Sequence, residues 1–198
     1  ATAKYLGLES EEKFRGMGVS ACATCDGFFY RKQDVVVVGG GDTACEEAMY
    51  LAGICKTVYL VVRKNFLRAS KAMQARLSKM ENIKVMYEHV TQEVIGDQNG
   101  VNGVKLLNGK GETVIVPVTG FFLAIGHTPN SGVFKKYLET DEVGYIKTIP
   151  GSSKTNVPGV FACGDVQDPH YRQAITAAGS GCIAALDAER YLSEAGLV

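Results

Sequence analysis

The stretch VVVVGGGDTACEEA, residues 35–48, decides the fold. Its four consecutive valines are typical of a strand that is buried on both faces of a parallel sheet. The residues after them fit the pattern G-x-G-x-x-A at the start of a helix, and a second apolar strand follows at residues 58–62. Strand, glycine-rich turn, helix and strand in this order predict a Rossmann-like α/β fold that binds a dinucleotide. We expect its pyrophosphate at the N-terminus of the helix, where the candidate cofactor-binding residues are Gly39, Gly41, Asp42, Thr43 and Ala44.

The residues after the second strand predict which dinucleotide binds. An NAD site usually has an acidic residue here, which holds the 2′-hydroxyl of the ribose. This chain instead has Arg63 and Lys64 directly after the strand and Arg68 shortly after them. Basic side chains suit a 2′-phosphate, and Arg can bind it with two parallel hydrogen bonds. We therefore expect NADPH, the alternative being a basic surface loop without a ligand.

Residues 22–26 read CATCD and predict redox chemistry. Two thiols at the spacing of Cys22 and Cys25 can close a disulfide, because one attacks as a thiolate and the other resolves the mixed disulfide. Asp26 follows directly and can pass a proton to or from a thiol. A structural zinc site and an inert cysteine pair are the alternatives. Zinc requires further ligands, which the isolated remaining cysteines do not offer, so we expect no metal site.

The other cysteines and the nearby aromatic residues are expected to serve packing. Cys45, Cys55 and Cys182 are interpreted as small buried hydrophobic residues, and Cys163 is given no redox role. Residues 27–30, GFFY, follow the cysteine pair, and we expect at least two of the three aromatic side chains to pack in the core.

Composition excludes several classes of function. The 198 residues carry 21 basic and 21 acidic side chains, and this zero net charge gives no indication of nucleic acid or an anionic membrane as a partner. Apolar runs are too short for a membrane-spanning helix, and the first residues do not resemble a signal peptide. Six cysteines with one close pair fit a reducing compartment such as the cytoplasm. The chain does not begin with Met, which suggests a piece of a longer protein.

The rest of the chain is divided by turn signals. Residues 1–20 are expected to be irregular, and residues 70–81 to form an amphipathic helix with Ser70 as its cap. Residues 83–118 alternate apolar runs with turns and predict a small antiparallel meander. A buried strand is expected at residues 121–125.

A domain boundary is expected at residues 126–130, where the composition changes. Beyond it, an apolar run at residues 160–163 is interpreted as a strand that ends in Gly164-Asp165, and residues 172–192 as a helix rich in small residues. A carboxylate at the end of such a strand lies where α/β folds hold ligands.

Together these motifs resemble the low-molecular-weight, bacterial-type thioredoxin reductases, which are class II pyridine nucleotide-disulfide oxidoreductases. The resemblance covers residues 1–198 and is specific. It depends on residues 22–29, the glycine pattern, Arg63 with Arg68, Ala124-Ile125-Gly126-His127, Gly164-Asp165-Val166 and Tyr171-Arg172-Gln173-Ala174-Ile175-Thr176.

The resemblance implies two domains. Residues 3–123 would be an NADPH domain that carries the cysteine pair, and residues 127–198 the C-terminal half of an FAD domain. The N-terminal half of that domain, with its own glycine pattern, is missing from the chain. Asp165 would bind the ribityl–phosphate part of FAD, and Arg172, Gln173 and Ala174 would lie near its isoalloxazine ring. Gly126 belongs to the implied cofactor-binding positions. Cys25 would be the cysteine nearer the flavin, with Asp26 as the acid–base group.

The implied reaction passes electrons from NADPH through FAD to the Cys22–Cys25 disulfide and on to thioredoxin. The family also implies a cytoplasmic homodimer whose inserted domain rotates. Two alternatives remain open. One is a related flavin disulfide reductase that serves a peroxidase partner, and the other is a non-catalytic NADPH-binding fragment without flavin.

Overall fold

The computed structural model describes residues 1–197, which form two compact units. One unit contains residues 3–126, and the other contains residues from 127 onward together with residues 1–2. The short strands β1 (Thr2–Ala3) and β10 (His127–Thr128) form a two-stranded sheet. The division falls inside the stretch where the composition changes. The assignment of NADPH and FAD to the two segments stays a prediction.

A five-stranded parallel sheet forms the centre of residues 3–126, with the strand order β2-β9-β3-β4-β5. Its strands are β2 (Val19–Ser20), β3 (Asp34–Val38), β4 (Thr57–Val62), β5 (Ile83–Tyr87) and β9 (Gly120–Leu123). The valines of β3 are buried on both faces, as expected of a central parallel strand. The expected α/β fold with a central parallel sheet is therefore confirmed.

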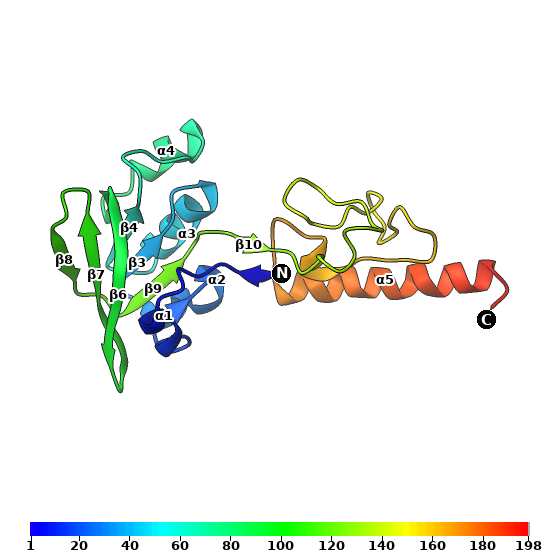
Figure 1. Cartoon of the computed structure of the whole chain (residues 1–198), viewed down its shortest axis with the longest axis horizontal. Coiled ribbons are helices and arrows are strands. Elements are labelled where there is room, and N and C mark those ends of the chain that lie inside the picture. The colour runs from blue at the N-terminus through cyan, green and yellow to red at the C-terminus, as the bar shows by residue number, and fades with distance from the viewer. Residues whose placement is uncertain (198) are drawn as a thin grey trace. The chain divides into compact units, whose positions relative to one another are not determined.

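The two faces of this sheet are covered by different structures (Figure 1). Helix α3 (Asp42–Ala52) covers one face, where its residues Ala44, Ala48 and Leu51 join a buried cluster with alternate valines of β3. The antiparallel strands β6 (His89–Asp97), β7 (Gly100–Asn108) and β8 (Thr113–Val116) cover the other face. The remaining helices are the short α1 (Glu9–Lys13), α2 (Ala23–Asp26) and α4 (Lys71–Leu77) and the 3-10 turn η1 (Gly27–Tyr30).

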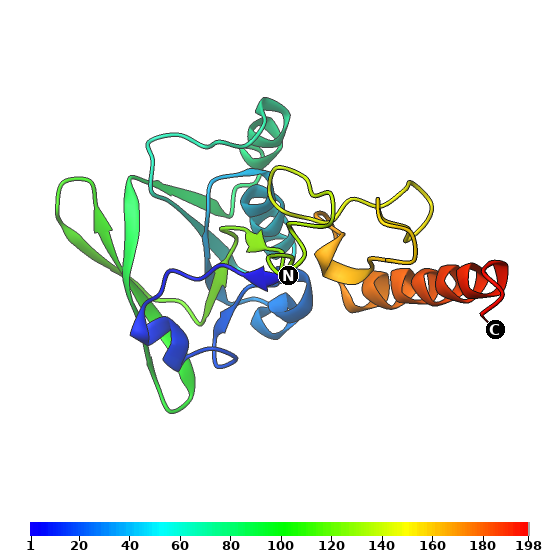
Figure 2. The same cartoon turned by 45° about the vertical axis from the view of Figure 1, so that its right-hand side comes forward.

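The segment from residue 127 onward has little regular structure apart from α5 (Ala174–Glu194) and the 3-10 turn η2 (Gly164–Val166). Figure 2 shows the irregular loops of this unit alongside α5, which is drawn in orange and red. A small apolar cluster of Leu138, Ile146 and Ala162 lies among these loops. Within residues 1–197 no helix is long and apolar enough to cross a membrane.

Four expectations about elements are corrected. Residues 1–20 are not wholly irregular, since they contain α1 and the sheet strand β2. Residues 83–87 do not belong to the meander but form β5, which pairs parallel to β4. Residues 160–163 form only the isolated bridge between Lys154 and Phe161, so Asp165 follows a turn and not a strand. Helix α5 begins only at Ala174, because Arg172 has a φ of 49° that an α-helix does not tolerate.

Candidate functional site

Cys22 and Cys25 form a disulfide across the first turn of α2, with their Cα atoms 5.3 Å apart. The sulfur of Cys22 accepts a hydrogen bond from the main-chain N–H of Cys25 at 3.2 Å. It also lies 3.4 Å from the hydroxyl oxygen of Thr24. The sulfur of Cys22 thus lies beside two hydrogen-bond donors in the oxidised form.

Asp26 ends helix α2, and its carboxylate is anchored by the serine of strand β2. The hydroxyl of Ser20 donates to Oδ2 of Asp26 at 2.6 Å, and Oγ of Ser20 accepts from the main-chain N–H of Cys22 at 3.0 Å. Tyr30 lies near the same carboxylate. Burial raises the pKa of the Tyr30 hydroxyl, and the charge of Asp26 raises it further. The acid expected from the sequence therefore lies in a defined polar arrangement beside the disulfide.

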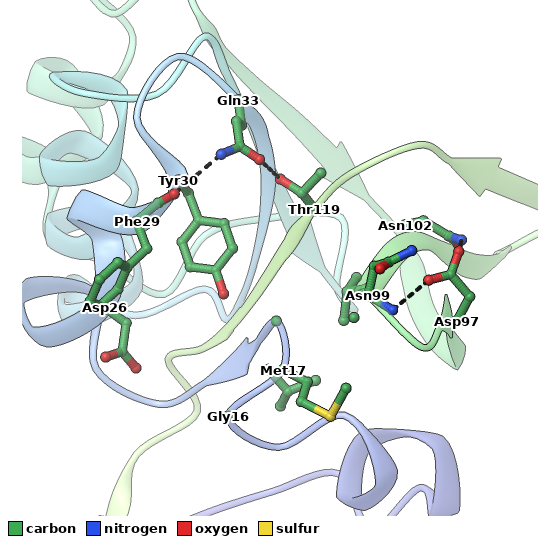
Figure 3. Close-up of a pocket in the computed structure, with 14 residues that line it drawn as sticks. Gly16, Met17, Asp26, Phe29, Tyr30, Gln33, Asp97, Asn99, Asn102 and Thr119 are labelled. Carbon is green, nitrogen blue, oxygen red and sulfur yellow. Dashed lines mark hydrogen bonds between the residues drawn. The ribbon is translucent and has the colours of Figure 1, made fainter.

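A cavity of about 690 Å³ opens beside Asp26 (Figure 3). Asp26, Phe29 and Tyr30 line one side, while Asp97 and Asn102 line the other. The glycine-rich segment of residues 16–18 contributes to its wall. Sequence reasoning missed this cavity, because the β6–β7 turn is brought to it only by tertiary packing.

The aromatic residues after the cysteine pair differ from expectation. Phe28 is 67% exposed and Phe29 is 72% exposed, so the prediction that at least two of the three pack in the core was wrong. Only Tyr30 is partly buried, with its ring edge-on to Phe122 at 5.3 Å between centroids. The 3-10 turn η1 changes the direction of successive side chains and leaves the two phenylalanines at the surface. An apolar surface therefore adjoins the disulfide.

The glycine turn has the geometry that close packing and ligand approach require. Gly39 has a φ of 152°, and a Cβ there would lie 2.5 Å from the carbonyl oxygen of Ala124 and 2.7 Å from the Cβ of Ala44. Only glycine fits this position. Gly41 caps α3, and a Cβ there would meet no atom within 4 Å, so its backbone is open to a ligand. Thr43 follows in the first turn of α3 and is exposed.

The basic loop expected to select the cofactor is tied to this turn. The main-chain N–H groups of Arg68 and Ala69 donate to the carbonyl of Gly40 at 2.7 and 3.1 Å. The carboxylate of Asp42 accepts from the N–H of Ser70 at 3.0 Å, and this hydrogen bond lowers the pKa of Asp42. Asp42 thus anchors the loop to the start of α3.

A second cavity of about 390 Å³ lies at the carboxyl ends of the parallel strands. Gly39 and Gly40 line it together with Arg63, Lys64 and Arg68, all three of which are exposed. Sequence reasoning missed Phe66 and residues 89–91, which also line it. The open backbone of Gly41 and the three cations near the cavity fit a dinucleotide that carries an additional phosphate.

Gly126 lies at the end of residues 3–126. It has a φ of 103°, and its carbonyl accepts from the N–H of Lys4 at 2.9 Å.

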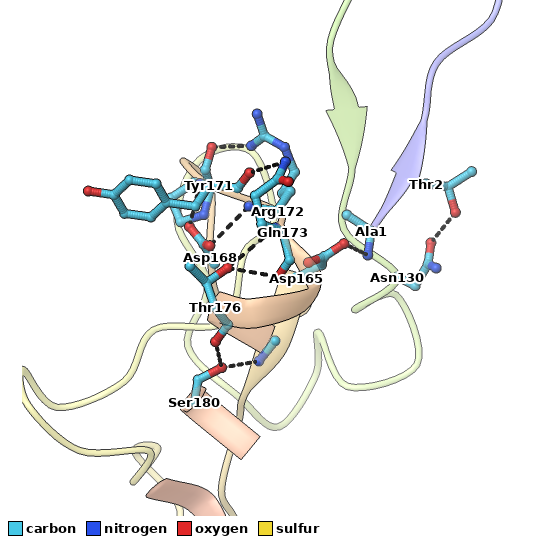
Figure 4. A network of polar contacts seen from close by, with 12 residues as sticks. Ala1, Thr2, Asn130, Asp165, Asp168, Tyr171, Arg172, Gln173, Thr176 and Ser180 are labelled. Atoms are coloured by element: carbon cyan, nitrogen blue, oxygen red, sulfur yellow. Dashed lines mark hydrogen bonds and ion pairs between the residues drawn. The ribbon is translucent and has the colours of Figure 1, made fainter. Parts of the chain in front are cut away.

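The remaining candidate residues lie together around the start of α5 (Figure 4). Asp165 lies in η2, and its carboxylate is 3.7 Å from the main-chain nitrogen of Ala1. Arg172 donates from Nη1 to the carbonyl of Pro169, and Gln173 is the N-cap of α5, so Ala174 is its first residue. The N–H of Gly164 donates to the hydroxyl of Ser180 at 3.0 Å, which ties η2 to α5.

Asp168 shapes the turn before α5. Its carboxylate accepts from the main-chain N–H groups of His170, Tyr171 and Arg172 at 2.8 to 3.1 Å. Burial raises the pKa of Asp168, but these hydrogen bonds outweigh burial and lower it overall.

The other cysteines do not form a second redox pair within residues 1–197. Cys45 and Cys55 are buried as expected, whereas Cys182 is exposed on α5, which corrects its interpretation as a core residue. No group of three His, Cys, Asp or Glu side chains in this part of the chain could hold a metal ion.

Known proteins resemble this arrangement over the whole chain. Thioredoxin reductase of Coxiella burnetii is 56% identical over 200 residues, which cover 97% of this chain and 62% of that protein. The mitochondrial thioredoxin reductase of Kluyveromyces lactis is 53% identical over 197 residues, which cover 98% of this chain and 56% of that protein. The structure of thioredoxin reductase from Giardia duodenalis has a TM-score of 0.91 at 44% identity and covers 97% of this chain and 63% of its own. The chain thus spans about three fifths of the length of these relatives.

The resemblance to thioredoxin reductases that the motifs predicted is therefore confirmed. Residues 1–181 match the family described as pyridine nucleotide-disulphide oxidoreductase, and these residues include the disulfide, the glycine turn and the basic loop. By this match the chain belongs to the pyridine nucleotide-disulphide oxidoreductase family.

Proposed function

We propose that the chain is part of an NADPH-dependent thioredoxin reductase. The observation that supports this most directly is the pairing of two features in residues 3–126. One is a disulfide with an adjoining acid, and the other is a cavity at a glycine turn with basic residues. A disulfide reductase needs both, because a reduced dinucleotide delivers the electrons and a thiol passes them to the substrate.

NADPH would bind with its pyrophosphate at the N-terminus of α3, near Gly39, Gly41 and Thr43. Its 2′-phosphate would be bound by Arg63, Lys64 and Arg68, the cations beside that turn. When bound, NADPH supplies the electron pair. Asp42 would act on the cofactor indirectly, by holding the basic loop against the start of the helix.

FAD would be held by Asp165, Arg172, Gln173 and Ala174; Gly126, which belongs to the other unit, is a cofactor-binding candidate by the resemblance alone. This assignment follows from the resemblance to the family, and from the common location of the first four residues around the start of α5. When bound, FAD carries electrons from the nucleotide to the disulfide.

The reduced cysteine pair then reduces its partner by two exchanges. The Cys22 thiolate attacks a sulfur of the partner disulfide, a Cys22–partner S–S bond forms, and one partner thiolate leaves with a proton from Asp26. The ionised Asp26 then takes the proton of the Cys25 thiol, and the resulting Cys25 thiolate attacks the sulfur of Cys22. The Cys22–Cys25 disulfide forms again, and the second partner thiolate leaves and takes a proton from water. Two electrons pass to the partner, which ends as a dithiol.

The surface around the disulfide suits a protein substrate. Phe28 and Phe29 expose large apolar side chains beside it, and the cavity next to Asp26 can receive a side chain of the partner. We propose thioredoxin as this partner, and a homodimer in the cytoplasm as the working enzyme, on the likeness to the family.

Two alternatives differ from this proposal in what they require. A peroxidase-linked reductase would use the same cofactors with another partner protein. A non-catalytic NADPH module is favoured by the fact that residues 3–126 contain both the disulfide and the dinucleotide cavity in one compact unit.

The test begins with the visible absorption spectrum of the purified chain after incubation with FAD and removal of the excess. A retained flavin band that NADPH bleaches, followed by reduction of thioredoxin, supports the proposal. A colourless protein that binds NADPH favours the module. A flavoprotein that oxidises NADPH but leaves thioredoxin oxidised favours another partner.

A further inference from the structure

Ser20 joins the two chemically active parts of the disulfide site. Its Oγ accepts the main-chain N–H of Cys22 at 3.0 Å, and its hydroxyl donates to Oδ2 of Asp26 at 2.6 Å. The carbonyl of Cys22 is the other acceptor within reach of the hydroxyl, but it lies 3.4 Å away. The hydroxyl proton therefore points to the carboxylate.

The position of Ser20 is fixed by the central sheet. It lies in β2, opposite Phe122 of β9 in the parallel register, and it is 8% exposed. Asp26 and Cys25, by contrast, belong to α2, which contains four residues and has Cys22 as its N-cap. Within residues 1–197, the bond from Ser20 is the one hydrogen bond that the Asp26 carboxylate accepts. The orientation of this acid thus depends on a side chain outside its own helix.

We propose that Ser20 is a positioning residue for thiol–disulfide exchange, which holds the Asp26 carboxylate beside Cys22 in the orientation that proton transfer requires. This inference rests on the proposed function of Asp26. Without this hydroxyl the carboxylate loses its contact with strand β2 and is no longer held in one position beside the thiols.

The other titratable groups near Asp26 define the background of this effect. Cys25 lies on the same helix and Cys22 is its N-cap, while Tyr30 of η1 is close enough for the charge of Asp26 to raise the pKa of its hydroxyl. Asp97 lies across the cavity, in the β6–β7 region (Figure 3). Ser20 does not titrate, but its hydroxyl group forms hydrogen bonds with both Asp26 and Cys22.

The experiment uses the whole reduced chain and oxidised glutathione, so neither flavin nor thioredoxin is involved. Rate constants for exchange are measured from about pH 5 to pH 9, and the part of the pH profile that Asp26→Asn removes is assigned to the carboxyl group. We expect Ser20→Ala to reduce that part of the profile and to slow exchange about three- to tenfold, because the carboxylate is no longer held beside the thiols. Ser20→Thr, which keeps a hydroxyl, should restore the original profile.

Three comparisons make the result decisive. In the Asp26→Asn background, Ser20→Ala should cause no further change, because the group on which Ser20 acts is gone. Ser70→Ala removes the hydroxyl that caps α4 and serves as the control for a purely structural loss. If Ser20→Ala does not fold, Ser20→Val is compared with Ser20→Thr instead. The two side chains have the same shape, and Thr has a hydroxyl group where Val has a methyl group.

An unchanged rate and pH profile in a folded Ser20→Ala or Ser20→Val variant overturns the inference, and so does an equal effect of Ser20→Ala in the Asp26→Asn background. Failure of the chain to reduce thioredoxin would count against the proposed function, but the glutathione profile would still be readable.

Discussion

Residues 3–126 and residues 127–197 are organised by different kinds of contact. The first unit has apolar clusters on both faces of its sheet, and Val35, Leu60 and Phe121 are fully buried there. The second has a small apolar cluster, and along the whole of α5 only Asp187 is buried. Ile175 is 80% exposed on that helix.

In the second unit, carboxylates join segments of the chain in addition to the small apolar cluster. Asp187 accepts from the N–H of Ser153 and from the hydroxyls of Ser152 and Ser153 at 2.8 to 2.9 Å. Asp141 accepts from the main-chain N–H groups of residues 143–145 at 2.7 to 2.9 Å. The disulfide and the dinucleotide cavity are therefore built on apolar clusters that lie entirely within residues 3–126, whereas the residues assigned to FAD lie at the start of α5 and in loops joined by polar contacts.

The largest difference is expected when the two units are produced as separate proteins. Residues 3–126 produced alone should fold cooperatively, form the Cys22–Cys25 disulfide and bind NADPH, because their apolar clusters are complete within the unit. Residues 127–198 alone should show no cooperative thermal transition. Circular dichroism and NADPH titration measure both. An unfolded 3–126 fragment would contradict the view that this core stands by itself.

Truncating one leucine in each unit compares how much a side chain contributes to stability in the two units. Leu60→Ala removes a fully buried side chain of β4 and should lower the free energy of unfolding by about 2–5 kcal/mol. Leu186→Ala on α5, where the side chain is 46% exposed, should change it by less than about 0.5 kcal/mol. Urea denaturation of the chain provides both values. Similar losses would mean that α5 packs more tightly than its exposure indicates.

The basic loop offers a test that changes binding without changing the core. Replacing Arg63 and Arg68 by Ala should weaken NADPH binding about ten- to a hundredfold, because charge-assisted hydrogen bonds to the 2′-phosphate are lost. NADH binding should change little. Arg76→Ala, an exposed cation on α4, is the matched control. Equal weakening of both nucleotides would contradict the 2′-phosphate assignment.

Acid should affect the second unit through Asp187. The hydrogen bonds from Ser153 and Ser152 lower the pKa of Asp187 to about 2, well below the value of about 3.9 in an unfolded chain. Because the folded pKa is the lower one, this stabilisation is complete above about pH 4 and is lost as the pH falls toward 2.

We therefore expect residues 127–197 to lose amide protection below about pH 4 while residues 3–126 still keep theirs. Hydrogen exchange at a series of pH values measures this. Asp187→Asn should weaken the pH dependence, and Glu189→Gln, an exposed carboxyl on the same helix, should not. Simultaneous loss of protection in both units would refute the distinction.

The sequence predicted those elements whose signals are local. The valine run, the glycine turn and α3 follow one another directly, so pattern and structure agree there. Strand β5 was assigned to the wrong sheet, because its parallel pairing with β4 depends on the path of residues 63–82. Strand β2 has two residues, which is too short for any periodic pattern.

The candidate site was predictable as a set of residue types but not as a geometry. The cysteine pair and Asp26 could be read from five consecutive residues. The hydrogen bond from Ser20 to Asp26 joins β2 to α2, and the side of the cavity at Asp97 is formed by residues far away in the sequence. Neither arrangement follows from a local pattern. Exposure of Phe28 and Phe29 also escaped prediction, since hydrophobic residues are often but not always buried.

The two buried cysteines have a practical consequence for chemical labelling. Burial raises the pKa of Cys45 and of Cys55 to about 11, with smaller contributions from nearby carboxylates, so both thiols stay protonated and shielded at neutral pH. Alkylating reagents react with thiolates and should bypass these two positions as long as the core is intact. A light label applied to the native chain and a heavy label applied after denaturation would then report, in one mass spectrum, both the oxidation state of Cys22 and Cys25 and the fraction of molecules that remain folded.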